Sequence, residues 1–165
     1  MSGERRGEWQ DWPFEPLAVM RVLRDHEVEY VLIGGVAAVL QGSPLPTYDI
    51  DITPAPGARN RSRLRDALTD LDATALTEID GAEQALGDQI DVSFYTPSGH
   101  LDVHHRLAGF TSYADLRRGS QPIQLEPDLT VQASSLRDII RSRLAAGDDR
   151  QLPALAAALE LERGS

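Results

Sequence analysis

The sequence contains no cysteine and no lysine. Without cysteine the chain cannot form disulfide bonds, thiolate zinc sites or a cysteine nucleophile, and without lysine it cannot use catalytic-lysine chemistry. It also lacks a long apolar run, since the longest, from Tyr30 to Leu40, is eleven residues and too short to cross a bilayer. The charged N-terminus is not followed by an apolar segment, so we expect no signal peptide. We therefore expect a soluble cytoplasmic protein with no membrane contact.

The chain is acidic, with a net charge of -10 from 26 acidic residues and 16 basic residues, all of them arginine. This charge disfavours non-specific binding to polyanions, but it leaves room for local contact with a nucleotide or an RNA end. Its length of 165 residues fits one domain. We expect a single domain over residues 1–165, with a core at about 28–133 and a helical part at about 134–165.

Helical and strand periodicities are mixed along the chain. One hairpin is predicted, around the turn formed by Pro97, Ser98 and Gly99. The pattern indicates an α/β or α+β protein with a mixed or mostly antiparallel sheet. The expected helices are 16–26, 36–41, 61–71, 113–118, 135–146 and 152–161, and the expected strands are 30–33, 49–53, 89–96, 100–104 and 123–125, with 72–79 as an ambiguous further strand.

The most tightly patterned strand is Asp49-Ile50-Asp51-Ile52. Side chains alternate along a strand, so the two aspartates share one face and the two isoleucines can pack into the core. Two adjacent carboxylates raise each other's pKa, and a divalent cation with oxygen ligands, such as Mg²⁺, removes that penalty. Taken alone, so short a motif is better explained by a solvated strand face with incidental aspartates. Tyr48 is expected in the core.

A glycine pair precedes this strand by thirteen residues. Gly34 and Gly35 end a strand and open a helix, where a phosphate can approach the backbone closely. Ser43 follows, with a hydroxyl suited to a phosphate oxygen. Each feature alone is explained by a simple turn or loop. In this order, together with the aspartates, they describe a triphosphate site that faces a metal site.

Two-metal phosphoryl transfer usually needs a third carboxylate. Asp102 is the preferred candidate because it lies in the clean alternation of "HLDVHH", and Asp91 in "QIDVSF" is the competitor. His104 shares the face of Asp102, but a plain histidine at the end of a strand is the favoured interpretation.

Three segments now carry a family resemblance: "VEYVLIGGVAAVLQGSPLPTYDIDIT", "SFYTPSGHLDV" and "SLRDIIRSRLAAG". Together they resemble nucleotidyltransferases of the polymerase-β type, and more closely the AbiEii-type enzymes that include the MenT toxins. The resemblance runs from about Val28 to Leu155. It implies a nucleotidyltransferase fold, in which helices flank a mixed β-sheet and further helices follow at the C-terminus.

The resemblance also implies the chemistry. An acceptor hydroxyl would attack the α-phosphate of an NTP, two Mg²⁺ ions would assist, and pyrophosphate would leave. The implied metal and catalytic residues are Asp49, Asp51 and Asp102, and the implied nucleotide-binding residues are Gly34, Gly35, Ser43, Arg143 and Arg150. Arg143 and Arg150 stand where relatives carry lysine, and Leu45 stands where they often carry arginine.

The implied partners are the NTP donor and an acceptor, either RNA (the 3′ end of a tRNA) or protein. The implied role is the toxin of a type IV toxin–antitoxin system, with a cognate antitoxin protein. Two alternatives remain open: a small-molecule (antibiotic) nucleotidyltransferase, and a non-catalytic module that binds nucleotide or a partner. An acceptor RNA could use Arg61 and Arg65, which share a helix face, although a solvated face is the simpler interpretation.

Overall fold

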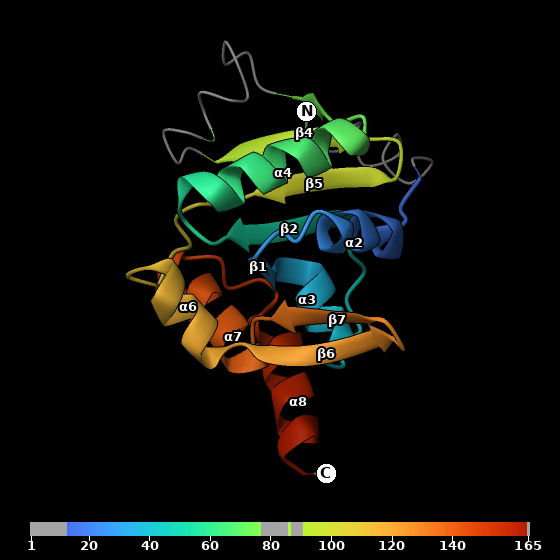
Figure 1. Cartoon of the computed structure of the whole chain (residues 1–165). Coiled ribbons are helices and arrows are strands. Elements are labelled where there is room, and N and C mark those ends of the chain that lie inside the picture. Colours follow the sequence, from blue (N-terminus) through green and yellow to red (C-terminus); the bar gives the residue numbers. More distant parts are fainter. Residues whose placement is uncertain (1–12, 77–85, 87–90, 165) are drawn as a thin grey trace.

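Seven strands form one mixed sheet at the centre of the protein (Figure 1). The computed structural model describes residues 13–76, 86 and 91–164. The strand order is β3-β4-β5-β2-β1-β7-β6; β2 pairs with β5 and β1 with β7 in parallel, and the other pairs are antiparallel. The strands are β1 (Tyr30–Ile33), β2 (Asp49–Pro54), β3 (Thr74–Ala75), β4 (Val92–Thr96), β5 (Gly99–Val103), β6 (Gln121–Glu126) and β7 (Leu129–Ala133).

Helices flank this sheet, and local sequence signals explain several of their ends. Pro16 stands in the first turn of α2, where its missing N–H costs no hydrogen bond. Ser112 and Ser135 cap α6 and α7, each accepting a hydrogen bond from a backbone N–H three residues later. The helices are α2 (Pro16–Asp25), α3 (Gly34–Leu40), α4 (Ala58–Asp70), α6 (Tyr113–Gly119), α7 (Leu136–Ala145) and α8 (Leu152–Arg163), and α8 carries the C-terminus away from the sheet (Figure 1).

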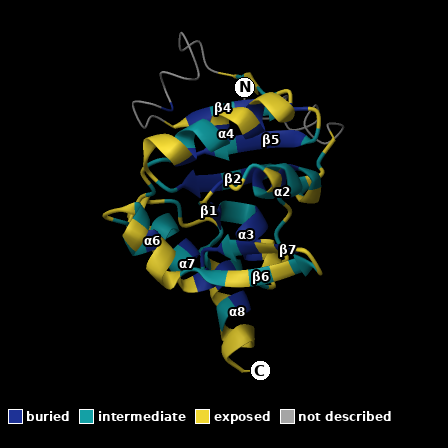
Figure 2. Cartoon of the chain, viewed as in Figure 1, coloured by how far each residue is buried: buried dark blue, intermediate teal, exposed yellow. Residues whose placement is uncertain are grey.

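The core lies mainly on one side of β2. Ile50 and Ile52 are fully buried and belong to one apolar cluster with residues of α2 and α4, such as Leu23 and Leu64. Figure 2 shows β2 and β5 mostly in the dark blue of buried residues. A smaller cluster joins Val31, Ile33 and Leu116 with Leu107, Phe110 and Tyr113. Val31 and Ile33 pair with Thr53 and Asp51, so this smaller cluster lies beside the carboxylate face of β2.

Asn60 fixes the loop that follows β2. Its buried side chain accepts a hydrogen bond from Glu29 N and donates to the carbonyls of Glu29 and Ala55, all at 2.8 Å. These bonds tie the start of α4 to Glu29, just before β1, and to Ala55, just after the central strand β2.

Most of the expected elements are confirmed within one to four residues. Two helices begin earlier than expected, at Gly34 and Ala58, and β7 was not predicted. The expectation that Tyr48 lies in the core is wrong, because it is 46% exposed in the loop before β2. Parts of two expected strands, 77–79 and 89–90, lie outside the described residues. Within the described part, no helix has both the length and the apolarity needed to cross a membrane.

Candidate active site

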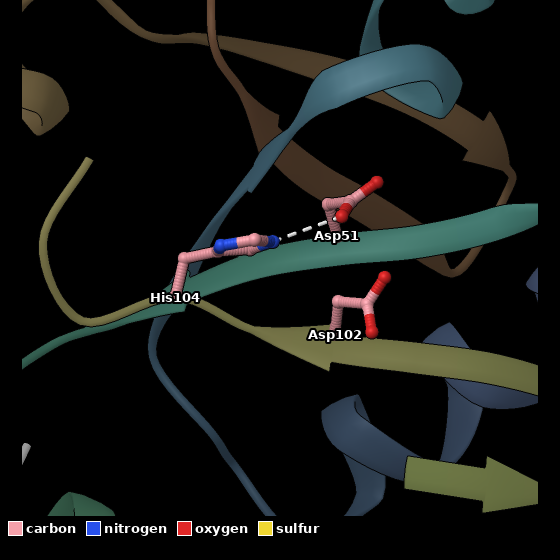
Figure 3. A group of neighbouring side chains, drawn as sticks. All are labelled: Asp51, Asp102 and His104. Carbon is pink, nitrogen blue, oxygen red and sulfur yellow. Dashed lines mark hydrogen bonds and ion pairs between the residues drawn. The ribbon is translucent and has the colours of Figure 1, made fainter. Parts of the chain in front are cut away.

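Two carboxylates meet because β2 and β5 run side by side in parallel. Their register places Asp51 directly beside Asp102 (Figure 3). Neighbouring strands lie about 4.8 Å apart, so side chains at paired positions on one face are forced together. The hairpin of β4 and β5 thus places Asp102, the predicted third carboxylate, beside β2.

His104 completes this cluster. Its Nε2 lies 3.0 Å from Asp51 Oδ1, and its Nδ1 lies 3.5 Å from Asp91 Oδ2. Ligand atoms of Asp51, Asp102 and His104 all lie within 4.8 Å of one another. The interpretation of His104 as a plain strand-end histidine is therefore corrected, and its shared face with Asp102 was the signal. Asp91 is placed on the far side of the histidine ring, where it also accepts a hydrogen bond from His105 N.

Burial and mutual repulsion perturb the carboxyl groups of the site. Burial, with the charges of Asp102 and Asp51, raises the pKa of Asp49 to about 6. Burial also raises the pKa of Asp102, against the opposing effect of a hydrogen bond from Ser93. The hydrogen bond to Asp51 raises the pKa of His104, so its protonated form is favoured there.

The donor set suits a hard divalent cation. Asp49 lies outside the group whose ligand atoms are within 4.8 Å, but its Oδ1 is buried and has no hydrogen-bond partner among the described residues. A buried carboxylate oxygen without a partner is costly, and a cation beside it removes the cost. Carboxylate oxygens are the ligands that Mg²⁺ prefers. Asp51, Asp102 and His104 could therefore hold a metal ion, and Asp49 lies on the same strand face with an oxygen that has no partner among the described residues.

Glycine is needed at both positions of the Gly34-Gly35 pair. Gly34 has a φ of +69°, and a Cβ there would lie 2.8 Å from Asp51 Oδ2. A Cβ on Gly35 would lie 2.5 Å from Thr47 Oγ1. The start of α3 is thereby brought against Asp51, and a side chain at either glycine would force Asp51, Thr47 or the start of α3 to move.

All the predicted nucleotide-binding residues except Arg150 line one or both of two adjoining hollows. Gly34, Gly35, Ser43 and Arg143 line a small cleft between α3 and α7. Gly34 and Arg143 also line a cavity of about 280 Å³ that includes Asp51, His104 and Arg106. Leu45, at the position where relatives often carry arginine, lines the small cleft.

Arginine charge reaches this site from α7. Arg143 Nη1 lies 3.0 Å from Asp148 Oδ2, which holds the guanidinium at the rim of both hollows. Arg150 pairs with the other oxygen of Asp148 at 3.4 Å, but its side chain is 82% exposed and lines neither hollow. The structure therefore brings Arg143 to the carboxylates and leaves Arg150 outside them.

Comparison with known proteins supports the fold. No protein-family model and no curated protein matches the chain. A crystal structure of a candidate nucleotidyltransferase from Thermotoga maritima matches with a TM-score of 0.59 and 14% identity, over 92% of this chain and 98% of that chain. The chain thus has the nucleotidyltransferase fold, and its mixed sheet with flanking helices agrees with the expected fold class.

Two structures of the antibiotic-resistance factor ANT(2″)-Ia are more distant. The solution structure has a TM-score of 0.49 and 15% identity, over 88% of each chain. The crystal structure with adenylyl-2″-tobramycin has a TM-score of 0.48 and 14% identity, over 87% of this chain and 94% of that chain.

Proposed function

We propose that this protein is a metal-dependent nucleotidyltransferase that moves NMP from an NTP to an acceptor hydroxyl. The observation that carries the proposal is the pairing of Asp51 with Asp102 across β2 and β5, beside the partnerless buried oxygen of Asp49. Carboxylates that are held together despite burial and mutual repulsion are typical of a site that binds a cation. The nucleotidyltransferase fold is consistent with this reaction.

The donor nucleotide would occupy the cavity of about 280 Å³ beside α3, because the small cleft has a volume of about 10 Å³ and holds no more than a water molecule. Gly34 lines this cavity and leaves the backbone open to the phosphates, whereas Gly35 and the buried Ser43 line the small cleft and would reach the phosphates only if that cleft opened. Arg143 would bind phosphate oxygens in the cavity, and Arg150 would reach them only from the exposed side of Asp148. In this arrangement Arg143 on α7 would bind phosphate in place of the arginine that relatives often carry at the position of Leu45.

Asp49, Asp51 and Asp102 would hold two Mg²⁺ ions, which when bound neutralise phosphate charge and orient the attacking and leaving oxygens. Asp102 has the second task of accepting the proton of the acceptor hydroxyl. The acceptor oxygen bonds to the α-phosphorus, the bond from that phosphorus to the bridging oxygen breaks, and pyrophosphate leaves. His104 positions Asp51 through its 3.0 Å hydrogen bond.

For the acceptor we propose RNA (the 3′ end of a tRNA) or protein, and for the cellular role the toxin of a toxin–antitoxin pair with a cognate antitoxin protein. The three sequence segments quoted above support this part of the proposal. Induced expression in bacterial cells tests the role: growth arrest is expected with the native chain and not with Asp51→Asn. Equal growth of both strains would contradict the toxin role and leave the transferase reaction open.

Label transfer tests the reaction. The purified protein is incubated with Mg²⁺, total tRNA and each α-labelled NTP in turn, and RNA and protein bands are read on one gel. Label is expected from at least one NTP and is expected to disappear in Asp51→Asn. Asp66→Asn is the matched control, since it removes the same charge from an exposed position on α4.

One outcome of this assay would favour the alternatives. No label on RNA or protein from any NTP, with folded protein, would favour a small-molecule acceptor or a non-catalytic module. A repeat with added aminoglycoside, read for a labelled small molecule, would distinguish these two.

A further inference from the structure

One nitrogen lies among the oxygen ligands of the candidate metal site. The ring of His104 points toward Asp51, and Asp102 lies on the neighbouring strand (Figure 3). The distance from His104 Nε2 to Asp51 Oδ1 is 3.0 Å. Two neighbouring ligands of one ion also lie about 3 Å apart, because metal–ligand bonds of about 2.1 Å meet at about 90° in octahedral coordination. These two atoms are therefore spaced as ligands of a single ion.

A cavity gives an ion access to both residues. Asp51 and His104 line the cavity of about 280 Å³, and the side chain of His104 is 31% exposed. Gly34 lines the same cavity and leaves space beside the other oxygen of Asp51, since a Cβ at this glycine would lie 2.8 Å from Oδ2. An ion that enters with its water shell can therefore exchange water for the carboxylate and the imidazole.

A further carboxylate lies behind the imidazole. Asp91 Oδ2 is 3.5 Å from His104 Nδ1, the ring nitrogen that does not contact Asp51. Asp91 is itself held by His105 N, which donates a hydrogen bond to Asp91 Oδ1 at 2.8 Å. An imidazole that binds an ion through one nitrogen keeps a proton on the other, and a carboxylate beside that proton fixes the ring. Asp91 therefore favours the tautomer of His104 that presents the lone pair of Nε2 to an ion.

Oxygen and nitrogen ligands together suit a different class of ion from oxygen ligands alone. Mg²⁺ prefers oxygen and gives up its water reluctantly, so it gains little from an imidazole. First-row transition ions such as Mn²⁺ accept the same carboxylates and gain affinity from an imidazole nitrogen. A histidine that is aimed at the carboxylates and supported from behind by Asp91 therefore favours a first-row ion over Mg²⁺.

We propose that Asp51, Asp102 and His104 hold a first-row transition ion such as Mn²⁺, with Nε2 of the histidine as one of its ligands. Asp91 positions the imidazole ring for that ion. This inference rests on the proposed transferase function and names the cofactor class of that site. It departs from the set of Asp49, Asp51 and Asp102 that the sequence resemblance implies, because a nitrogen ligand joins the oxygens and Asp91 acts through it.

Metal binding without nucleotide tests the proposal independently of catalysis. Mn²⁺ is titrated into the full chain and free Mn²⁺ is followed by electron paramagnetic resonance, while competition with Mn²⁺ gives the affinity for Mg²⁺. His104→Gln is expected to weaken Mn²⁺ binding about tenfold or more and to change the affinity for Mg²⁺ less than about twofold, because the lost ligand is a nitrogen. An equal loss of affinity for both ions would overturn the proposal. His26→Gln is the matched control, since His26 pairs with Asp70 and lines neither hollow of the site.

Pulsed electron paramagnetic resonance of bound Mn²⁺ identifies the nitrogen directly. A coordinated imidazole nitrogen modulates the electron spin echo of Mn²⁺, whereas carboxylate oxygens do not. The modulation is expected in the native chain and in His26→Gln, and it is expected to vanish in His104→Gln. Bound Mn²⁺ without this modulation in the native chain would overturn the proposal. Modulation that survives in His104→Gln would come from another nitrogen and would overturn it as well.

Asp91→Asn tests the positioning role at a side chain that is 53% exposed, where a folding defect is not expected. Asparagine keeps an oxygen that can accept the hydrogen bond from His105 N. The ratio of Mn²⁺ affinity to Mg²⁺ affinity is expected to fall about tenfold, and to fall no further when Asp91→Asn is added to His104→Gln. Asp66→Asn removes the same charge from an exposed position of α4 and should leave the ratio unchanged. An equal change for both ions, as loss of charge alone would give, would overturn the role of Asp91.

The label-transfer assay, run with Mn²⁺ and with Mg²⁺, separates this inference from the proposed function. A nitrogen signal that His104→Gln removes, with no label transferred from any NTP and either ion, would refute the transferase and retain the transition-metal site. Label transfer with Mg²⁺ by both the native chain and His104→Gln, together with native Mn²⁺ that shows no nitrogen signal, would retain the transferase and refute this inference.

Discussion

Replacing Asp49 with asparagine is expected to stabilise the metal-free protein. Its carboxyl has a pKa of about 6, against 3.8 for an unperturbed aspartate, because burial and two neighbouring carboxylates penalise its charge. A difference of about 2 units corresponds to about 3 kcal/mol, which we reduce to about 1–2 kcal/mol because the side chain is partly exposed. For a chain of this size that gain raises the melting temperature by about 2–8 °C. Thermal unfolding at pH 7.5 in EDTA measures it.

The gain depends on pH with a definite sign. The folded-state pKa of Asp49 is raised, so between pH 3.8 and about 6 the folded state binds more protons than the unfolded state, and the native protein loses stability as pH rises. The difference between Asp49→Asn and the native chain is therefore expected to be complete above pH 7 and to vanish near pH 4. Asp66→Asn, at an exposed position of α4, serves as the control for net charge.

Added Mg²⁺ is expected to make the melting temperature of the native chain higher than that of Asp49→Asn. The native chain gains stability from a bound cation by mass action, and Asp49→Asn gains less because it lacks one ligand. A melting temperature of Asp49→Asn at or below the native value in EDTA would refute the reasoning. That result would mean that the carboxylate of Asp49 is already satisfied in the metal-free protein.

Three further results are expected. Gly34→Ala places a side chain at a φ of +69° and against Asp51. It should lower the free energy of unfolding by about 1–3 kcal/mol and abolish label transfer. A native-like melting temperature would show that the start of α3 can shift away from Asp51. Asn60→Ala removes three partly buried hydrogen bonds and should lower the free energy of unfolding by about 1–3 kcal/mol in chemical denaturation. A loss under about 0.5 kcal/mol would mean that those bonds add little beyond what solvent supplies. His104→Gln should destabilise the metal-free protein most below pH 6.5, with the difference fading as pH rises through the raised pKa of His104; a difference independent of pH would contradict the hydrogen bond to Asp51 as its source.

The local sequence was sufficient for those parts of the fold that depend on nearest neighbours. The alternation of Asp49 to Ile52 predicted which side chains enter the core, and Ile50 and Ile52 are fully buried. The serine before α7 and Gly147 after it predicted the ends of that helix. Strand β7 was missed because "LTVQA" follows a Pro127-containing turn and is too short for its period to stand out.

Contacts between distant segments could not be predicted in the same way. Alternation placed His104 on the face of Asp102, but only the parallel pairing of β2 with β5 brings its ring to Asp51. The cavity of about 540 Å³ that residues 53–57 and 105–107 line depends on the loop after β5 folding back toward the segment after β2, and no local signal in the sequence specifies that. Tyr48 was misjudged because its side chain was expected to face away from the two carboxylates and therefore into the core, although it lies in the loop before β2, where it is exposed.

The in-register pairing of β2 and β5 also constrains how this protein can change through evolution. Asp51 and Asp102 face each other only while the count of residues along both strands is preserved. One inserted or deleted residue within either strand would turn a carboxylate into the core and an isoleucine or leucine out to the site, so folding and chemistry would fail together. Substitutions carry no such penalty at the apolar positions, where volume is what matters. Descendants of this chain should therefore drift far in composition while keeping the lengths of these two strands fixed, and length conservation, more than identity, would be the mark by which they are recognised.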